Sequence, residues 1–216
     1  MGKEMMIERD RGYWDVISGE YDKFMFGEFG YIYDKLVEKI PKLIPKGALV
    51  LDVGTGTGIA AIAASPKAGR IIGIDMSMKM MEKAKKKIKE RGIGNVEIQM
   101  GNLYSLPFEN DSFDCALCCN TLHMVENLEQ VFSEIKRVLK PKGLFISGTF
   151  CYGENCNNLK RMGHGILSFF WKIGLIPPIH LHKKGEFLKR IEGYFEIVED
   201  ENLSNDPLFL IVTAKK

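Results

Sequence analysis

The sequence predicts an α/β fold: a doubly wound, mostly parallel sheet of seven strands with helices on both of its faces. Short apolar runs bounded by turn residues recur along the chain, and such runs are typical of strands that are buried on both faces. Most of these runs are separated by segments whose apolar residues recur at helical spacing. In an open α/β sheet, ligands bind outside the carboxyl ends of the strands, so we expect the functional site at that edge.

Composition places the chain among ordinary globular proteins. Its 216 residues suit a single domain with a substantial core, and 45% of them are hydrophobic and 27% charged. The formal net charge is only +2, from 30 basic and 28 acidic residues, so nucleic acid is not an expected partner. The N-terminal run MGKEMMIERD contains acids and no apolar stretch, which argues against a signal peptide. No apolar run reaches the ~20 residues that a membrane-spanning helix needs.

Cysteine usage indicates a reducing environment. The chain has five cysteines, an odd number that fits the cytoplasm better than a disulfide framework. Three of them, Cys115, Cys118 and Cys119, lie in one apolar run. A zinc site needs four convergent ligands, whereas only one C-x-x-C pair is present, so we expect no metal and interpret these thiols as small core residues.

The central motif of the chain is a glycine-rich turn that follows the first predicted strand, residues 48–53. Gly54, Gly56 and Gly58 alternate with threonines and precede a helix of small residues. Glycines in such a turn let the backbone bend tightly and let a ligand approach it, while the N–H groups of the next helix point at that ligand. A dinucleotide-binding turn has the spacing G-x-G-x-x-G, but the third position after Gly56 is Ile59.

An acid, Asp52, stands two residues before the first glycine. It would repel a pyrophosphate but could accept a cationic amino group. The run LDVGTGTG resembles the first motif of class I S-adenosylmethionine-dependent methyltransferases, in which this loop holds the methionine part of the cofactor. The resemblance implies a Rossmann-like sheet whose last strand is antiparallel. It also assigns cofactor binding to Asp52, Gly54, Thr55, Gly56 and Gly58.

Two further segments extend the resemblance to the adenosine half of the cofactor. The second predicted strand, residues 70–75, ends in Asp75, whose carboxylate could accept two hydrogen bonds from a ribose diol. Met76 is placed to pack on the adenine. The third predicted strand is followed by Asn102 and Leu103, which are assigned to the same end of the cofactor. The family usually has aspartate at the position of Asn102, and the amide oxygen could equally accept from the adenine amino group.

The fourth and fifth predicted strands frame a second region of resemblance. Asn120 ends the fourth strand, residues 113–120, and is placed at the cofactor edge. A helix capped by Asn127 and a strand over 144–149 follow the family pattern LHH…R-V-L-K-P-G-G, where this chain has LHM and KPKG. His123 lies just beyond the fourth strand and is expected to face the cleft. It could act as a general base toward the substrate, or only shape the pocket through hydrogen bonds.

The N-terminal part of the chain is expected to cover the cofactor-binding core, residues 46–150. Residues 1–45 are rich in aromatic side chains and predict a helical lid, with a helix over 32–40 that ends at Pro41. Many small-molecule methyltransferases of this class carry a similar Tyr-Asp segment in a lid. Tyr21 is therefore assigned a cofactor contact, and the alternative is that it only packs.

The C-terminal part departs from the minimal fold. Residues 151–184 form an insertion, and residues 185–216 predict a closing helix and two strands. The insertion contains the apolar run 166–179, which is too short to cross a bilayer. It is expected either to cap an apolar substrate pocket or to form a homodimer interface.

Together these patterns predict a cytoplasmic enzyme that transfers a methyl group from S-adenosylmethionine to a small, apolar molecule by in-line displacement. Positive sulfur already activates the methyl group, so the main tasks of the protein are alignment and exclusion of water. One alternative is an NAD-type oxidoreductase on a similar sheet, which Asp52 and Ile59 disfavour. The other is a non-catalytic module that only binds the cofactor. The acceptor atom, whether O, N, C or S, stays open.

Overall fold

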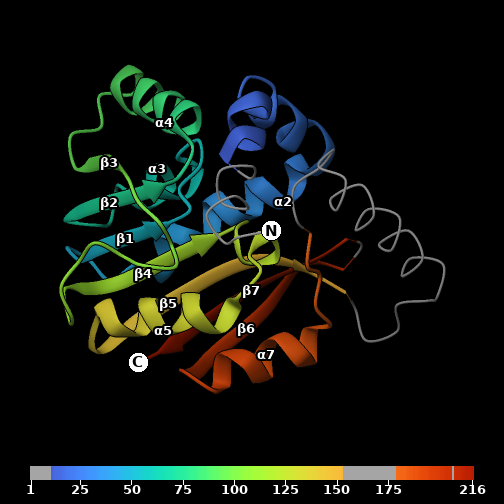
Figure 1. The fold of residues 1–216 in the computed structure, drawn as a ribbon. Helices are drawn as coiled ribbons and strands as arrows, with labels where there is room; N and C mark the ends of the chain where they lie inside the picture. The colour runs from blue at the N-terminus through green and yellow to red at the C-terminus, as the bar shows by residue number, and fades with distance from the viewer. Residues whose placement is uncertain (1–10, 153–178, 206) are drawn as a thin grey trace.

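The computed structural model describes residues 11–152, 179–205 and 207–216 of the chain. Predictions for residues 1–10, and most of those for the 151–184 insertion, therefore lie outside the described residues. The centre of the fold is a seven-stranded sheet with the strand order β3-β2-β1-β4-β5-β7-β6 (Figure 1). Its strands are β1 Leu49–Val53, β2 Arg70–Asp75, β3 Val96–Met100, β4 Phe113–Cys119, β5 Leu139–Cys151, β6 Glu196–Asn205 and β7 Leu208–Lys215.

The sheet is doubly wound, as predicted. Strands β1 to β5 pair in parallel, whereas β7 runs antiparallel to both β5 and β6. The chain enters the sheet at β1 and later continues on its other side at β4. The carboxyl ends of β1 and β4 therefore lie side by side where the winding reverses, which is the usual ligand-binding position of such sheets.

Helices cover both faces of the sheet (Figure 1). Val50 on β1 packs with Leu36 and the other buried residues of α2 and α3, whereas its neighbour Leu51 packs on the opposite face with Phe132 and the residues of α5 and α7. This alternation follows from the two-residue period of a strand. The helices are α2 Tyr21–Leu43, α3 Ile59–Ala64, α4 Met78–Glu90, α5 Leu128–Val138 and α7 Lys184–Glu192, with a short 3₁₀ turn, η1, at Leu122–Met124 and a further helical stretch over residues 11–17.

The two predicted helix caps are confirmed. The Ser77 side chain accepts a hydrogen bond from the Met80 N–H at 3.1 Å and starts α4. The Asn127 side chain accepts one from the Gln130 N–H at 3.0 Å and starts α5. The cap at Ser77 matters for the site, because it sets the position of the loop that follows β2.

Two predicted boundaries are wrong. The helix expected to end at Pro41 continues to Leu43, because a proline near a helix end removes only one N–H donor, and Ile44 still donates to the Ile40 carbonyl at 3.3 Å. Strand β5 begins at Leu139 rather than after the Pro-Lys-Gly turn. Leu139 already pairs with Phe113, and a bulge then accommodates the turn.

Of the three cysteines of β4, two lie in the core, whereas Cys119 at the carboxyl end of the strand is only partly buried. Cys115 and Cys118 are fully buried, and burial raises the pKa of both thiols. This is the environment expected of small core residues. Within the part of the chain that the structure describes, no helix is both long and apolar enough to cross a membrane.

Candidate active site

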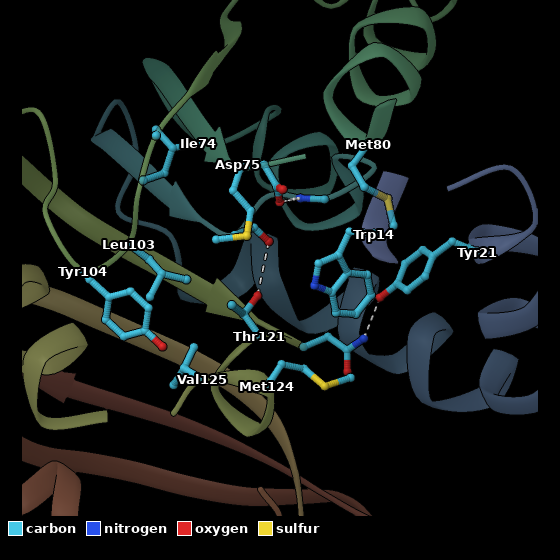
Figure 2. A pocket seen from close by; sticks show the side chains of 15 residues that line it. Trp14, Tyr21, Ile74, Asp75, Met80, Leu103, Tyr104, Thr121, Met124 and Val125 are labelled. Carbon is cyan, nitrogen blue, oxygen red and sulfur yellow. Dashed lines mark hydrogen bonds between the residues drawn. The ribbon is translucent and has the colours of Figure 1, made fainter. Parts of the chain in front are cut away.

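A pocket opens at the carboxyl ends of β1, β2 and β4, beside the loop after β3 and the N-terminal helical segment (Figure 2). It contains about 820 Å³ of space, its open mouth included. Its position is the sheet edge at which the sequence predicts the site. The lining consists of Trp14, Tyr21, Gly54, Gly56, Ile74, Asp75, Met76, Met80, Gly101, Leu103, Tyr104, Asn120, Thr121, Met124 and Val125. The sequence-based assignments that meet here are Tyr21, Gly54, Gly56, Asp75, Met76, Leu103 and Asn120.

Each glycine of the turn is required for a different structural reason. Gly54, Gly56 and Gly58 all have positive φ, at 71°, 54° and 81°, a conformation that L residues with side chains rarely adopt. A Cβ on Gly54 would lie 2.6 Å from the Thr121 side chain, and one on Gly58 would lie 3.1 Å from the Ala84 Cβ. A Cβ on Gly56 would meet nothing within 4 Å. Gly56 therefore faces the open pocket, whereas Gly58 allows α3 and α4 to pack closely and lies outside the lining.

Asp75 joins two of the loops that form the pocket. One carboxylate oxygen, Oδ2, accepts the Gly56 N–H at 2.8 Å, and the other, Oδ1, accepts the Ser77 N–H at 2.9 Å. Burial raises the pKa of Asp75, and these two backbone donors oppose that shift. The carboxylate is thus held in one orientation at the pocket wall before any ligand arrives.

Asp52 lies in a second, smaller cavity behind the glycine turn. This cavity has about 410 Å³ of space and is lined by Asp52, Thr55, Thr57, Tyr33 and others, and it shares Gly54, Gly56, Tyr21 and Asn120 with the first pocket. The Asp52 side chain is 1% exposed, and its Oδ2 accepts the Thr55 hydroxyl at 2.7 Å. Its Oδ1 has no well-formed hydrogen bond among the described residues, although the Ala61 N–H, like the Thr55 hydroxyl, lowers the pKa of this carboxylate. Burial raises the pKa of Asp52 to about 6.

These atoms fit the amino-acid end of S-adenosylmethionine. A buried carboxylate oxygen without a partner is costly, and a cationic amino group beside it would remove that cost. The Asn120 side chain is similarly half-satisfied: its Nδ2 donates to the Tyr21 hydroxyl oxygen at 2.7 Å, while its Oδ1 finds no partner among the described residues. Gly56 lines both cavities and so lies between this end and the Asp75 carboxylate, for which the sequence analysis predicts a ribose contact.

The expected adenine end is apolar. Ile74, Met76, Met80 and Leu103 line it, and thioether side chains adapt well to a flat ring. Asn102 does not line the pocket. Its Oδ1 accepts the Tyr104 N–H at 2.9 Å and so stabilises the turn after β3. Its contact with the adenine amino group stays a prediction.

Residues 51–147 match a family model described as a methyltransferase domain. A segment of 97 residues is 40% identical to the uncharacterised methyltransferase YcgJ of Bacillus subtilis, and it covers 45% of this chain and 38% of that protein. A segment of 148 residues is 34% identical to the demethylmenaquinone methyltransferase of Bacillus velezensis, covering 65% of this chain and 63% of that protein. The geranyl diphosphate C-methyltransferase of Streptomyces coelicolor, solved with S-adenosylhomocysteine, has a TM-score of 0.71 at 17% identity, covering 91% of this chain and 84% of that one.

Residues 51–147 of this chain are therefore identified as a methyltransferase domain. The resemblance of the glycine turn to that family is confirmed, and so is the link to the quinone-biosynthesis branch. The match with the solved structure, at 17% identity, is evidence for the fold alone. The chain spans less than two thirds of the length of both sequence relatives.

The methyltransferase domain buries His123 instead of turning it toward the cleft, so that expectation is wrong for the two described cavities. The imidazole is 5% exposed, lies outside both linings, and has its Nδ1 3.0 Å from the Thr149 hydroxyl. Burial lowers the pKa of His123 to about 3, and His180 and His182 add to the shift. An imidazole with such a pKa is neutral at pH 7 and a weak base. The geometry favours the shaping role over the base role.

Several lining residues of the domain are absent from the sequence-based assignments. Thr121 donates from its hydroxyl to the Gly54 carbonyl at 3.2 Å and packs over the turn. Trp14 stands in the helical stretch over 11–17, before the turn that leads into α2, and its ring centroid is 6.1 Å from that of Tyr21. Its place in the aromatic-rich N-terminal run is a signal that could have identified it. Tyr104 lies in the turn after β3 and Met124 ends η1, and the sequence pattern predicts the path of neither segment.

Proposed function

We propose that this methyltransferase domain binds S-adenosylmethionine and transfers its methyl group to a small, apolar molecule. The observation that carries the proposal is the pair of adjoining cavities at the glycine turn. One contains the unpaired, buried oxygen of Asp52, and the other contains the fixed carboxylate of Asp75 beside an apolar wall. S-Adenosylmethionine is a zwitterionic amino acid joined to a nucleoside. Its amino group needs a counter-charge, its ribose needs hydrogen-bond acceptors and its adenine needs an apolar surface, in this order.

The proposed roles follow the order of the groups along the sheet edge. Asp52 would hold the amino group, Asp75 would accept hydrogen bonds from the ribose diol, and Met76 and Leu103 would pack on the adenine. Gly56 would leave room for the chain between the two ends. An NAD pyrophosphate would instead meet the unpaired oxygen of Asp52, which disfavours the oxidoreductase alternative.

When bound, the cofactor would supply a methyl group activated by positive sulfur: the acceptor forms the new bond to carbon, and the carbon–sulfur bond breaks to leave a neutral thioether. The residues of this chain would align the two reactants and keep water out. Trp14 and Tyr21 cover the pocket from the N-terminal segment, and Met124 and Val125 form its apolar wall (Figure 2). The described lining contains no imidazole or amine, and its carboxylate, Asp75, accepts two backbone N–H groups and is assigned to the ribose, so we assign no general base.

The apolar part of the lining supports an apolar acceptor. Trp14, Tyr104, Met124 and Val125 line the larger pocket but not the cavity around Asp52. Relatives and neighbours include proteins named for demethylmenaquinone and geranyl diphosphate, two molecules with isoprenoid chains. We therefore propose an isoprenoid-type acceptor, in a cytoplasmic enzyme whose 151–184 segment either walls the acceptor or joins two copies. Sedimentation of the protein would distinguish a monomer from a dimer.

Calorimetry tests the cofactor first. S-Adenosylhomocysteine should bind, NADH should not, and the Gly56→Val variant should fold but lose the binding. A screen with methyl-labelled S-adenosylmethionine then follows label into short-chain demethylmenaquinone and geranyl diphosphate. Binding of NADH in place of S-adenosylhomocysteine would restore the oxidoreductase alternative. Cofactor binding with no transfer to any apolar acceptor would favour the non-catalytic module.

A further inference from the structure

The segment over residues 11–24 covers the pocket with little apolar burial of its own. Trp14 and Tyr21 face the pocket from this segment (Figure 2). Within it, Ser18 is the one fully buried residue, Trp14 and Tyr21 are half-buried, and Phe24 is 58% exposed. Since hydrophobic stabilisation scales with the apolar area removed from water, packing supplies only part of its attachment. Polar contacts must supply the rest.

Two aspartates make these contacts. Asp15 accepts a hydrogen bond from the Ser77 hydroxyl at 2.6 Å. Asp22 accepts one from the Thr57 hydroxyl at 2.5 Å through Oδ1, and its Oδ2 pairs with the Lys87 Nζ at 2.6 Å. Ser77 belongs to the loop after β2, and Thr57 belongs to the glycine turn. The segment is thus attached to two of the loops that form the proposed cofactor site.

These attachments are connected through the site itself. Asp75 accepts the backbone N–H of Ser77 on one oxygen and that of Gly56 on the other. Gly56 is the neighbour of Thr57, whose hydroxyl donates a hydrogen bond to Asp22. The carboxylate proposed to bind the ribose therefore lies between the two anchors. A shift of either anchor would move a loop that holds this carboxylate in place.

The Asp22 anchor is weak enough to open. The Asp22 and Lys87 side chains are 36% and 22% exposed. Burial lowers the pKa of Lys87, and the hydrogen bond with Asp22 opposes that shift. Partly exposed ion pairs contribute little net stability and are screened by salt. The segment should therefore exchange between a closed and an open position in the empty protein.

We propose that Asp15 and Asp22 are positioning residues that couple closure of segment 11–24 to cofactor binding. The inference rests on the proposed function, because the coupled ligand is S-adenosylmethionine. Closure brings Trp14 and Tyr21 over the pocket and, through the two anchors, holds both loops in their binding geometry. A ligand that binds the closed form favours closure by the same factor by which closure favours the ligand.

The first test measures S-adenosylhomocysteine binding by calorimetry and its dissociation by stopped flow. Asp22→Asn and Lys87→Met should each weaken binding by about 3- to 15-fold, mainly through faster dissociation. The matched controls are Asp34→Asn on α2 and Lys86→Met on α4, both exposed positions, and they should stay within about twofold of wild type. The double variant Asp22→Asn/Lys87→Met should lose less than the product of the single losses, since both remove one interaction.

The second readout needs no bound ligand. The chain has 2 tryptophans. In a Trp171→Phe background Trp14 remains, so its emission reports whether the segment covers the pocket. Asp22→Asn should shift the emission of the empty protein to longer wavelength, and saturating S-adenosylhomocysteine should reverse part of the shift. Asp34→Asn should leave the emission unchanged.

The outcomes separate the possible failures. If Asp22→Asn lowers the urea-unfolding midpoint but leaves dissociation and Trp14 emission at wild-type values, Asp22 is only structural and the inference is overturned. Equal weakening by Asp34→Asn would overturn it as well, because the effect would then be one of general charge. A wild-type protein that binds no S-adenosylhomocysteine would refute the proposed function, and Trp14 emission would still decide whether the aspartates hold the segment closed.

Discussion

Asp52→Asn should remove a loss of stability that wild type suffers as the pH rises from 4.5 to 8, while it weakens S-adenosylhomocysteine binding. The carboxylate is 1% exposed, and burial raises its pKa from an ordinary 3.8 to about 6. Because the folded pKa lies above the unfolded one, protonation favours the folded state. That contribution is fully present below about pH 4 and is lost as the pH rises through about 6. Above that range the folded protein carries a buried charge that the unfolded chain exposes to water.

The size of the effect follows from the shift. A rise from 3.8 to about 6 corresponds to ~3 kcal/mol at 1.36 kcal/mol per unit, of which about 2 kcal/mol falls between pH 4.5 and pH 8. Asparagine can still accept the Thr55 hydroxyl, but its amide N–H groups would lack partners, which costs ~1–3 kcal/mol at every pH. The change with pH is therefore a cleaner measure than the absolute difference. Relative to wild type, the variant should gain about 2 kcal/mol of unfolding free energy between pH 4.5 and pH 8.

Urea unfolding of both proteins at the two pH values measures this gain. Asp34→Asn, an exposed position on α2, is the control and should show no such dependence. Calorimetry at pH 8 should show weaker S-adenosylhomocysteine binding by the Asp52 variant, since the amino group loses its counter-charge. A stability difference that stays constant across the two pH values would refute the buried-charge reasoning. Unchanged affinity would remove Asp52 from the cofactor site.

The other predictions concern the same edge of the sheet. Asp75→Ala should weaken S-adenosylhomocysteine binding by ~1–3 kcal/mol, the range for a hydrogen bond to a charged group, and unchanged calorimetric affinity would remove the ribose assignment. Gly56→Val should abolish binding, because valine is strained at a φ of 54° and fills open pocket space; normal binding by a folded variant would place the site elsewhere. Deleting residues 1–30 should leave a folded core that binds poorly, and Tyr21→Ala should show part of that loss; full affinity in the truncated protein would mean that the segment only packs. His123→Asn should leave the pH dependence of methyl transfer unchanged between pH 6 and 8, because the pKa of His123 is about 3, and a lost pH-dependent step there would revive the base role.

The strands and caps could be predicted because they depend on local properties. The predicted bounds of the second strand, residues 70–75, agree with β2, since a short apolar run between turn residues has few other stable environments. Ser77 and Asn127 could be recognised as caps because a side-chain oxygen at that position satisfies a free N–H of the first turn. The glycine turn was recognisable from its spacing alone.

Contacts between distant segments could not be predicted in the same way. Asp15 meets Ser77 and Asp22 meets Lys87 across more than 60 positions of the chain, and no periodicity encodes such pairs. His123 was placed correctly just beyond β4, but the direction of its ring depends on Thr149 of a different strand. These details arise from tertiary packing, which a one-dimensional pattern constrains only weakly.

The position of the site at the open sheet edge accounts for several of these features together. An open α/β sheet leaves its carboxyl edge accessible to water, whereas transfer of an activated methyl group requires water to be excluded. This chain covers the edge with a segment that gains little from its own burial, and it keeps the carboxylate of Asp52 buried without a full set of partners. Both features raise the free energy of the empty, closed form, and a ligand that pairs with Asp52 while favouring closure relieves both. Ligand binding should therefore stabilise the whole domain, with an unfolding midpoint that keeps rising with S-adenosylhomocysteine concentration above the Kd.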